Sequence, residues 1–498
     1  MLTSRWFLAL LMTGVASLVA LTAAPAAIAA PCSAPVRYAA TSNRITVSAA
    51  TESVTLSDIK RLCPGAPLQL LDASNRTWLL SADLVLDGGS RLLLDGAAGG
   101  DAAVLLLKSG SSGTLQDVAS ITAQHGGITL RDTSVRSHDP ATGGPDTSTV
   151  VPTGGVRGRA FIRALSYMDG STPKESRMDI VRSDIGHLGY NASESYGVAY
   201  KARGCGASTP AVCDTLSVRG EQVDSTFHDN YMGTYTWGAQ DMVFLRNVYT
   251  RNVSYGLDPH DDSDFLTITG NTFSENGNHG LICSQRCNNL TITDNVSRDN
   301  GTLGTGEVHG IMLHRGITDS LVQNNVVSGN TTGGGIVLFD SVGNTVRNNR
   351  LDRNKYGFRF SVGSRGTLVT GNTVTGSLAH AVYTFKGSDA PVYSGTSGRP
   401  SDVTFDGNTF GAAGSTLFRV LDADRFTFVR GAVVGPVSAG PRFERSSDNV
   451  FDQSVVIPAG LQFTLRGTST TRTSMLFRGM TRDQVGLSTD AFSTATFG

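Results

Sequence analysis

The chain has 498 residues, which at about one domain per 150 residues suggests three domains. Glycine supplies 58 residues and proline 16, while charged residues make up 17% of the chain, below the usual share of about 25%. The 41 Lys and Arg residues balance 42 Asp and Glu residues, so the net charge is −1. This composition excludes collagen and disordered chains. It also argues against a general nucleic-acid binder or a membrane-surface protein, so a charged partner must meet a local patch.

The first 29 residues have the features of a secretory signal peptide. Arg5 precedes an apolar run over residues 6–21, and Ala-Ile-Ala at 27–29 fits the cleavage rule for such peptides. The small residues that end the run disfavour the alternative, an N-terminal membrane anchor. No later run reaches the roughly 18 apolar residues that a membrane span needs. We therefore predict a signal peptide at 1–29 and a secreted or periplasmic protein.

The six cysteines fall into pairs that are close in sequence: Cys32 with Cys63, Cys205 with Cys213, and Cys283 with Cys287. Export favours disulfides over metal binding or redox chemistry. Sequence alone leaves the connectivity open, and the short spacing of the local pairs suggests that they staple loops.

A repeat of about 24 residues runs through residues 240–410. Apolar β runs end on asparagine, and successive asparagines are 24, 24, 30, 24, 23 and 36 residues apart. A second series of glycines, each opening an apolar run, keeps the same register: Gly256, Gly280, Gly310, Gly335 and Gly357. Each unit cannot bury its own apolar face and must stack on its neighbours, so the period predicts a parallel β-helix. The intervals of 30 and 36 predict loop insertions.

We expect one elongated all-β domain, and a monomer, in place of three domains. The predicted organisation after the signal peptide is an N-terminal cap at 30–68, the β-helix at 69–430, and C-terminal strands and a cap at 431–498. Caps cover the ends of a solenoid, whose open strand edges would otherwise pair with other chains. The Pro-, Gly-, Thr- and Asp-rich segment 137–156 predicts a surface loop.

Aligning the coils on their opening glycines places equivalent residues in columns, about 4.8 Å apart from strand to strand. Four positions after each glycine stand Lys201, Trp237, His260, Ser284 and His314, and two positions after it stand Ala199, Tyr235, Asp258, Ile282 and Met312. Positions two apart share a face, so His260 and Arg286 should lie on one face, one coil apart. Basic and aromatic side chains on that face suit a linear polyanion, because arginine binds carboxylates and aromatic rings stack on sugars.

The densest polar segment is YGLDPHDD at 255–262, and several interpretations compete for it. Ordinary turn chemistry explains Asp-Pro followed by more Asp, with a solvated histidine. The carboxylates of Asp258, Asp261, Asp262 and Asp264 could hold calcium, although their spacing is not that of an EF-hand loop. A zinc site from His260, His279, His309 and His314 is less favoured, because no H-E-x-x-H spacing occurs.

Together, YGLDPHDD at 255–262 and HGLICSQR at 279–286 resemble mannuronan C5-epimerases, the bacterial periplasmic and algal enzymes that act on alginate. The family's Asp-Pro-His-Asp/Glu motif stands at 258–261, and its HGI-type strand ending in arginine stands at 279–286. The segment 187–197 resembles the family's lead-in to this site, and the resemblance spans residues 120–385. It implies a right-handed parallel β-helix that converts β-D-mannuronate to α-L-guluronate within alginate or a similar polyuronate.

The resemblance also implies roles for four residues. His260 would be the general base that takes the C5 proton, and Arg286 would neutralise the adjacent carboxylate with a bidentate contact. Tyr255 or a water would return the proton to the opposite ring face, and Asp258 would orient His260 or Arg286. Further substrate-binding candidates are Lys201, Tyr235, Trp237, His279, His314 and Arg359. We expect no cofactor, with calcium as the alternative, and no calcium-binding nonapeptide repeats follow the motif, which favours a single-module enzyme.

Two rival functions remain open. A polysaccharide lyase on the same fold would share the proton abstraction and then eliminate the 4-O-linked sugar, and an epimerase could act on another uronan. A non-catalytic solenoid that binds glycans would not depend on His260.

Overall fold

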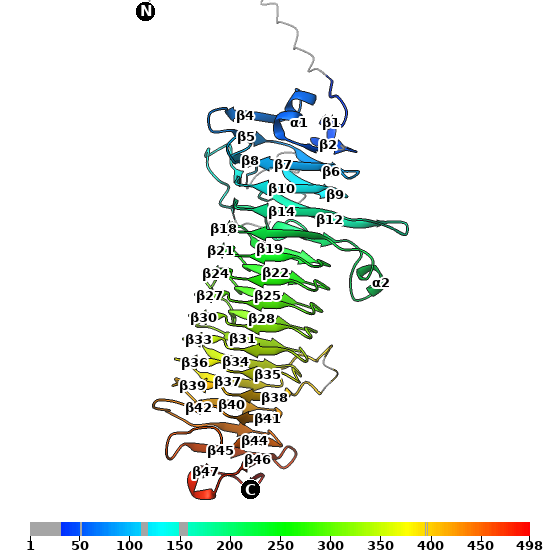
Figure 1. Ribbon diagram of the computed structural model, residues 1–498. Coiled ribbons are helices and arrows are strands. Elements are labelled where there is room, and N and C mark those ends of the chain that lie inside the picture. Colours follow the sequence, from blue (N-terminus) through cyan, green and yellow to red (C-terminus); the bar gives the residue numbers. More distant parts are fainter. Residues whose placement is uncertain (1–30, 50–51, 111–117, 149–157, 394, 396) are drawn as a thin grey trace, which may run out of the picture.

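The computed structural model describes residues 31–498 apart from 50–51, 111–117, 149–157, 394 and 396, so the expected signal peptide lies outside the described residues. Figure 1 shows one elongated stack of coils, with helix α1 (Leu56–Leu62) at one end and strand β47 (Gly486–Ser488) near the other. No helix among these residues is long and apolar enough to cross a membrane.

Three long sheets run along the stack, and we name them A, B and C after their sizes of 18, 16 and 14 strands. Each central coil gives one strand to each sheet, as β19 (Met232–Trp237), β20 (Val243–Leu245) and β21 (Val248–Thr250) do. The pairings between successive central coils are parallel, for example β20 with β23 (Thr267–Thr269). The predicted parallel β-helix is therefore confirmed, and one solenoid replaces the three domains that the length suggested.

Sheet A carries the columns that the glycine alignment predicts. Its central strands are β16 (Gly197–Ala202), β19, β22 (Leu257–His260), β25 (Leu281–Ser284), β28 (Ile311–His314), β31 (Gly334–Phe339) and β34 (Tyr356–Ser361). Lys201 pairs with Trp237, Trp237 with His260, His260 with Ser284, and Ser284 with His314. Pro259 has no N–H to donate, yet the register is the same on both sides of it, at Leu257↔Leu281 and His260↔Ser284.

The repeated asparagines form a buried hydrogen-bonded ladder. The side-chain Nδ2 of Asn271 donates to Oδ1 of Asn295 at 3.0 Å, and Asn295 donates to Asn325 at 2.9 Å. The same Oδ1 of Asn295 also accepts the backbone N–H of Asn271 at 2.8 Å. The ladder thus satisfies corner N–H groups that burial would leave without partners. A second ladder, not noticed in the sequence, joins Asn252, Asn276, Asn300, Asn330 and Asn354.

Replacing Asn295 with alanine should lower the free energy of unfolding by about 2–4 kcal/mol, because two buried donors of Asn271 lose their acceptor. Urea titration followed by circular dichroism measures this loss. The control is Arg298→Ala, which removes an exposed side chain paired only with its neighbour Asp299. A loss for Asn295→Ala no larger than for Arg298→Ala would contradict the structural role of the ladder.

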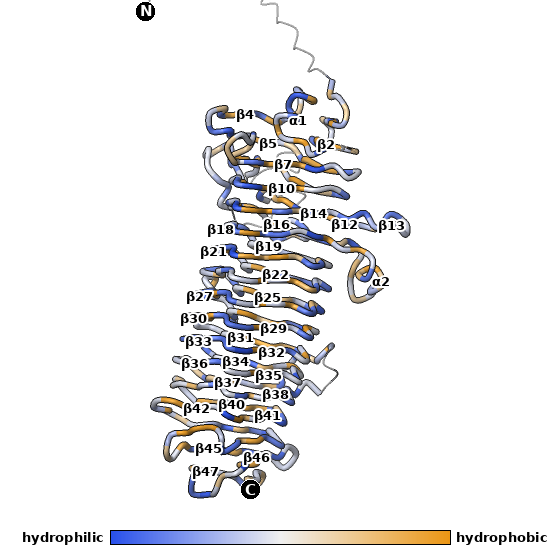
Figure 2. The backbone as a smooth tube through the Cα atoms, viewed as in Figure 1, coloured by the Kyte–Doolittle hydropathy of each residue, from blue (hydrophilic) through white to orange (hydrophobic). Residues whose placement is uncertain are grey.

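Every second residue of a typical strand points its side chain into the interior. Leu257, Leu281 and Ile311 are fully buried in sheet A, and phenylalanines stack in the later coils, as Phe405 does on Phe428 with ring centroids 4.9 Å apart. Figure 2 shows apolar and polar stretches alternating along the coils. The residues between them point outward, where their side chains can form a functional site.

Two of the three local cysteine pairs form disulfides, Cys32–Cys63 and Cys205–Cys213. Cys283 and Cys287 are free thiols, which corrects the expectation of a third staple. Both belong to the apolar core, and the sulfur of Cys287 lies 3.6 Å from the carbonyl oxygen of Pro259. Burial raises the pKa of both thiols, which keeps them protonated.

The long intervals in the repeat are loops, at 301–308 and 386–399, between strands that stay in register. At the C-terminal end, β46 (Thr473–Arg478) still pairs in parallel with β48 (Ser493–Phe497). The predicted surface loop at 137–156 lies partly outside the described residues, and the domain boundaries at 68 and 430 stay predictions.

Candidate active site

The outer face of sheet A carries two apolar clusters that are separate from the core. One contains Ala199, Met232 and Tyr235, and the other contains Ile282, Met312 and Val337. Tyr255 packs against both clusters, so it joins them across the coil that carries the Asp-Pro-His-Asp segment. This segment and its flanking coils form the candidate site.

His260 is held by an aromatic stack and a carboxylate. Its ring lies parallel to that of Trp237, with centroids 5.3 Å apart and planes at 11°, and its Nδ1 contacts a carboxylate oxygen of Asp261. Burial alone would lower the pKa of His260, but the contact with Asp261 and the charges of Asp258 and Asp261 outweigh it and raise the pKa above the usual 6.5. The side chain is about one quarter exposed, so its other nitrogen is available to a ligand.

Arg286 does not lie on the sheet face, which corrects the predicted geometry. The strand ends at Ser284, and Gln285 and Arg286 adopt positive φ of 69° and 56°, so the alternation of faces stops there. The guanidinium turns back to the preceding coil, where Nε and Nη2 each donate to Asp262 at 3.0 Å and Nη2 also contacts Asp261. Asp261 therefore bridges His260 and Arg286. The sequence had suggested Asp258 for this orienting role.

The remaining contact of Arg286 comes from a distant loop. Its Nη1 donates to the hydroxyl of Tyr393 at 2.7 Å. The loop 386–399 is fastened over this coil because Asp340 accepts the backbone N–H groups of Val392 and Tyr393, at 2.7 and 3.0 Å. Of the five guanidinium N–H groups, one on Nη1 is left for a ligand.

Asp258 lies on the same face as His260 and is fully buried, and its Oδ1 has no hydrogen-bond partner among the residues that the structure describes. Burial raises the pKa of Asp258 to about 7, against the opposing effects of His260 and Ser284. Near neutral pH a large fraction of this carboxyl is therefore protonated and able to donate a hydrogen bond.

Tyr255 starts an aromatic row along one edge of the face. It stacks on His279 at 5.5 Å, and His279 stacks on His309 at 4.9 Å. Nδ1 of His279 accepts the backbone N–H of His309, and Nδ1 of His309 accepts that of Gly334, both at 2.9 Å, so the ring proton of each neutral histidine is on Nε2. Burial lowers the pKa of His279 to about 3 and that of His309 well below its usual value, so both stay neutral donors.

The ring of Trp237, predicted to bind the substrate, has two protein partners in the structure. One face of the Trp237 ring is covered by the Lys201 ammonium, 4.6 Å from the ring centroid, and the other by His260. Neither face is open to a sugar, so Trp237 supports His260. Tyr235 is buried beside it, with its ring 5.6 Å from that of His260.

Two clusters of cations lie on this face, on either side of His260, and each holds a protein carboxylate. Glu194 accepts from Arg203 and lies within 3.7 Å of Lys201. Six strands along sheet A, Arg359 contacts Glu307, which also accepts from Lys355 at 2.9 Å. Between them, the ring of His314 lies 4.8 Å from that of Phe339, with the two planes tilted by 41°, and burial lowers the pKa of His314 to about 4. Arginines and lysines are thus brought to one face, as the sequence predicts, but with acidic partners that it does not predict.

Three contributors to the site were missed by sequence reasoning: Asp261 as the bridge, Tyr393 and Glu307. The last two lie in the loops that account for the 36- and 30-residue intervals. These two long intervals could have pointed to Glu307 and Tyr393, because a loop inserted into a solenoid must cover one of its faces.

Carboxylate and histidine clusters elsewhere do not fit a metal. Both nitrogens of His228 are engaged, by Asp229 at 2.7 Å and Asp184 at 3.2 Å, so in the cluster of His187, His228 and Asp229 the His228 ring has no lone pair left for a metal. The group of Cys205, Cys213 and Asp262 contains a disulfide rather than thiolates. In the Asp258–Asp264 segment, Asp261 and Asp262 are paired with Arg286.

Comparison with known proteins supports the fold and the resemblance. Residues 197–412 match the family described as periplasmic copper-binding protein (NosD), although the histidine and cysteine clusters above do not fit copper. A mannuronan C5-epimerase of Pseudomonas putida is 33% identical over 206 residues, covering 41% of this chain and 33% of that protein. The mannuronan C5-epimerase AlgG of Azotobacter vinelandii is 36% identical over 232 residues, covering 40% and 38%. The chain therefore spans about a third of the length of these relatives.

The crystal structure of the periplasmic alginate epimerase AlgG superposes with a TM-score of 0.66 at 22% identity, over 79% of this chain and 85% of that one. At this identity the likeness concerns the fold, and it confirms the right-handed parallel β-helix. The resemblance to mannuronan C5-epimerases seen in the motifs is confirmed by the sequence matches.

Proposed function

We propose that this chain is a mannuronan C5-epimerase that inverts C5 of uronate residues within a polymer. The observation that carries this proposal is the His260–Asp261–Arg286 network, which places a base of raised pKa beside a guanidinium. This network supports proton abstraction next to a carboxylate, and two relatives of the chain are named mannuronan C5-epimerases.

His260 takes the C5 proton in this mechanism. Asp261 contacts Nδ1, so the other ring nitrogen faces the substrate, and the imidazolium that forms is stabilised by the Asp261 carboxylate. The stack on Trp237 fixes the plane of the His260 ring.

The substrate carboxylate must be neutralised before the neighbouring carbon can lose a proton. The bidentate contact of Arg286 that sequence reasoning assigned to the substrate is used by Asp262, so Arg286 contributes its free Nη1–H together with the hydroxyl of Tyr393. Asp258, with its pKa of about 7, adds a carboxyl that can donate to the developing enediolate.

Tyr255 would return the proton to the opposite face of the ring. It packs against the two outer apolar clusters, one on each side of the coil that carries Asp258 and His260. Burial raises the pKa of Tyr255 to about 12, which keeps its hydroxyl protonated and able to act as the acid. Water is the alternative donor.

The polymer would lie along sheet A, with its carboxylates near Lys201 on one side and Arg359 on the other. Six strand spacings of about 4.8 Å make this track roughly 29 Å long. The Nε2–H groups of His279 and His309 supply uncharged donors for hydroxyl groups beside it. The reaction uses groups of the chain itself, and a calcium requirement stays an alternative.

Two other functions remain as outcomes of a test. A lyase would eliminate the 4-linked sugar after the same abstraction, and a glycan-binding solenoid would do neither. Export to the periplasm or cell exterior is supported by the disulfides, and we propose a monomer with caps at 30–68 and 431–498.

Proton NMR of polymannuronate incubated with the protein in D₂O distinguishes these functions. Deuterium at C5 together with guluronate signals supports the epimerase. Unsaturated ends absorbing in the ultraviolet would indicate a lyase, and no exchange at C5 would reject both enzymes. Polyglucuronate in a parallel tube tests whether another uronan is the substrate.

Replacing Glu307 with glutamine should lower the KM for polymannuronate by about threefold to tenfold, equivalent to about 0.7–1.4 kcal/mol. Glu307 occupies Lys355 and Arg359 with its own carboxylate, so the neutral amide leaves these cations to the substrate. Steady-state kinetics at low and high salt measure the change. The matched control is Glu275→Gln, which removes the same charge from an exposed corner. An unchanged or raised KM would contradict this role for Arg359.

A further inference from the structure

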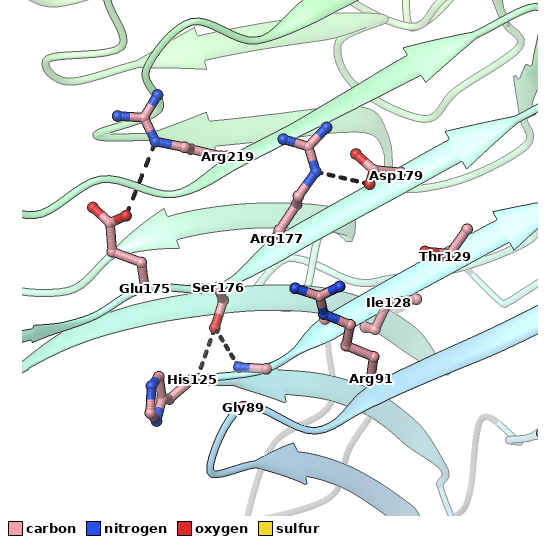
Figure 3. Close-up of a pocket in the computed structure, with 12 residues that line it drawn as sticks. Gly89, Arg91, His125, Ile128, Thr129, Glu175, Ser176, Arg177, Asp179 and Arg219 are labelled. Atoms are coloured by element: carbon pink, nitrogen blue, oxygen red, sulfur yellow. Dashed lines mark hydrogen bonds and ion pairs between the residues drawn. The ribbon is translucent and has the colours of Figure 1, made fainter. Parts of the chain in front are cut away.

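A cleft of about 480 Å³ opens at the corner of the solenoid where sheet A leads into sheet B, away from His260. Its volume is typical of ligand pockets. Figure 3 shows its lining, in which Arg91, Arg177 and Arg219 come from three different strands of sheet B. Three glycines also line it: Gly89, Gly126 and Gly127.

The arginines belong to one column of sheet B. The strands are β7 (Arg91–Asp95), β10 (Gly127–Arg131), β14 (Arg177–Val181) and β17 (Arg219–Val223). Gly127 pairs with Arg91 on one side and Arg177 on the other, and Arg177 pairs with Arg219. Arg91 and Arg177 are therefore two strands apart, about 9.6 Å, with a residue that has no side chain between them.

The glycine at position 127 is explained by the lack of room for a side chain beside Arg91. Its φ is not in the left-handed region, so the backbone there accepts any residue. A Cβ at this position would lie 3.0 Å from Cγ of Arg91, so the missing side chain lets Arg91 extend over the hollow. This arrangement keeps an arginine directed into the cleft, where a larger residue would close it.

Two arginines of the cleft retain free donors. Arg91 is exposed and has no hydrogen bond or ion pair within the described part of the chain. Arg177 uses only Nε, which donates to Asp179 at 2.8 Å, so both of its Nη groups are free among the same residues. Arg219 differs, because it is paired with Asp241 at 2.7 Å.

The acidic groups of the cleft are fixed by backbone donors. Asp179 accepts the N–H of Glu221 at 3.1 Å, and Glu175 accepts the N–H of Ser217 at 2.9 Å. A phosphate dianion would be repelled by these carboxylates. A uronate suits them, because its carboxylate meets the free arginine donors while its hydroxyls donate to Asp179 and Glu175.

We propose that the Arg91–Gly127–Arg177 cleft is an accessory binding site for a uronate residue of an anionic polysaccharide. A neighbouring cleft of about 470 Å³ shares Glu175 and Arg219 with it and extends to Asp262, the residue that holds Arg286. A polymer bound in the cleft is thereby kept close to the sheet A groove, which raises its effective concentration there. The choice of uronate rests on the proposed function.

Binding is tested in the His260→Gln protein, so that turnover does not interfere. Isothermal titration with a mannuronate decamer should show two classes of site, and one should disappear in Arg91→Ala/Arg177→Ala and in Gly127→Thr, which fills the hollow without changing the charge. Arg131→Ala is the control, because it removes an exposed arginine of the same strand that pairs with Asp95 outside the cleft. In the catalytically intact protein, the two cleft variants should raise the KM for long polymannuronate about tenfold with kcat retained.

A single class of site in the His260→Gln protein, or two classes that survive both cleft variants, would overturn the accessory site even if C5 exchange is observed. Conversely, two classes of site without any C5 exchange would retain the cleft and reject the proposed epimerisation. Competition by inorganic phosphate as strong as by the decamer would assign the cleft to anions in general and overturn the uronate assignment, as would equal binding of a neutral glucan.

Discussion

His260→Gln should reduce deuterium incorporation at C5 of polymannuronate by about 10²–10⁴-fold, the usual contribution of a general base. Glutamine keeps a polar side chain between Trp237 and Asp261 but cannot take a proton at neutral pH. NMR of the exchange and of the guluronate formed measures the loss. His138→Gln, a substitution on another face of the solenoid, is the control for general damage.

The pH profile gives an independent check on the same residue. A general base must be neutral, so kcat/KM should fall as the pH drops through the pKa of His260, which Asp261 holds above 6.5. Asp261→Asn should move that acid limb to lower pH, because the neutral amide no longer stabilises the imidazolium. A limb that stays in place in Asp261→Asn, or exchange that survives in His260→Gln, would remove His260 from the mechanism.

Arg286→Lys should lower kcat by about 10²–10³-fold, the effect of losing a positioned electrostatic stabiliser. Lysine keeps one positive charge but cannot make the two contacts with Asp262 and still reach Tyr393, so the charge loses its fixed position. Steady-state kinetics on polymannuronate should show the change mainly in kcat.

Rescue separates a chemical role of Arg286 from a structural one. Guanidinium ions added to Arg286→Ala should restore part of kcat, whereas they should not affect Arg347→Ala, which removes an exposed arginine bonded to Gln323. An Arg286→Lys protein with full kcat would contradict the assigned role. Full activity in Tyr393→Phe would show that Arg286 acts without the loop hydroxyl.

The repeat was sufficient to predict the fold and much of the site's layout. Asn247, Asn271 and Asn295 mark buried corners, and the strands lie at constant distances in sequence from them. The sequence alone was therefore enough to align the columns of sheet A. The alignment correctly paired Trp237 with His260 and His260 with Ser284. It failed at Arg286 because positive φ after Ser284 ends the strand, a local backbone choice that periodicity does not encode.

The sequence by itself therefore determined the glycine-rich, charge-poor solenoid, the coil register and the position of the Asp-Pro-His-Asp segment, because these depend on contacts between neighbouring coils about 24 residues apart. The tertiary structure alone decided the partners of the key cations. Tyr393 reaches Arg286 across 107 residues and Glu307 reaches Arg359 across 52, through loops whose paths follow no repeat. The net charge of −1 is likewise explained only in three dimensions, where each basic cluster of the groove is matched by a nearby carboxylate.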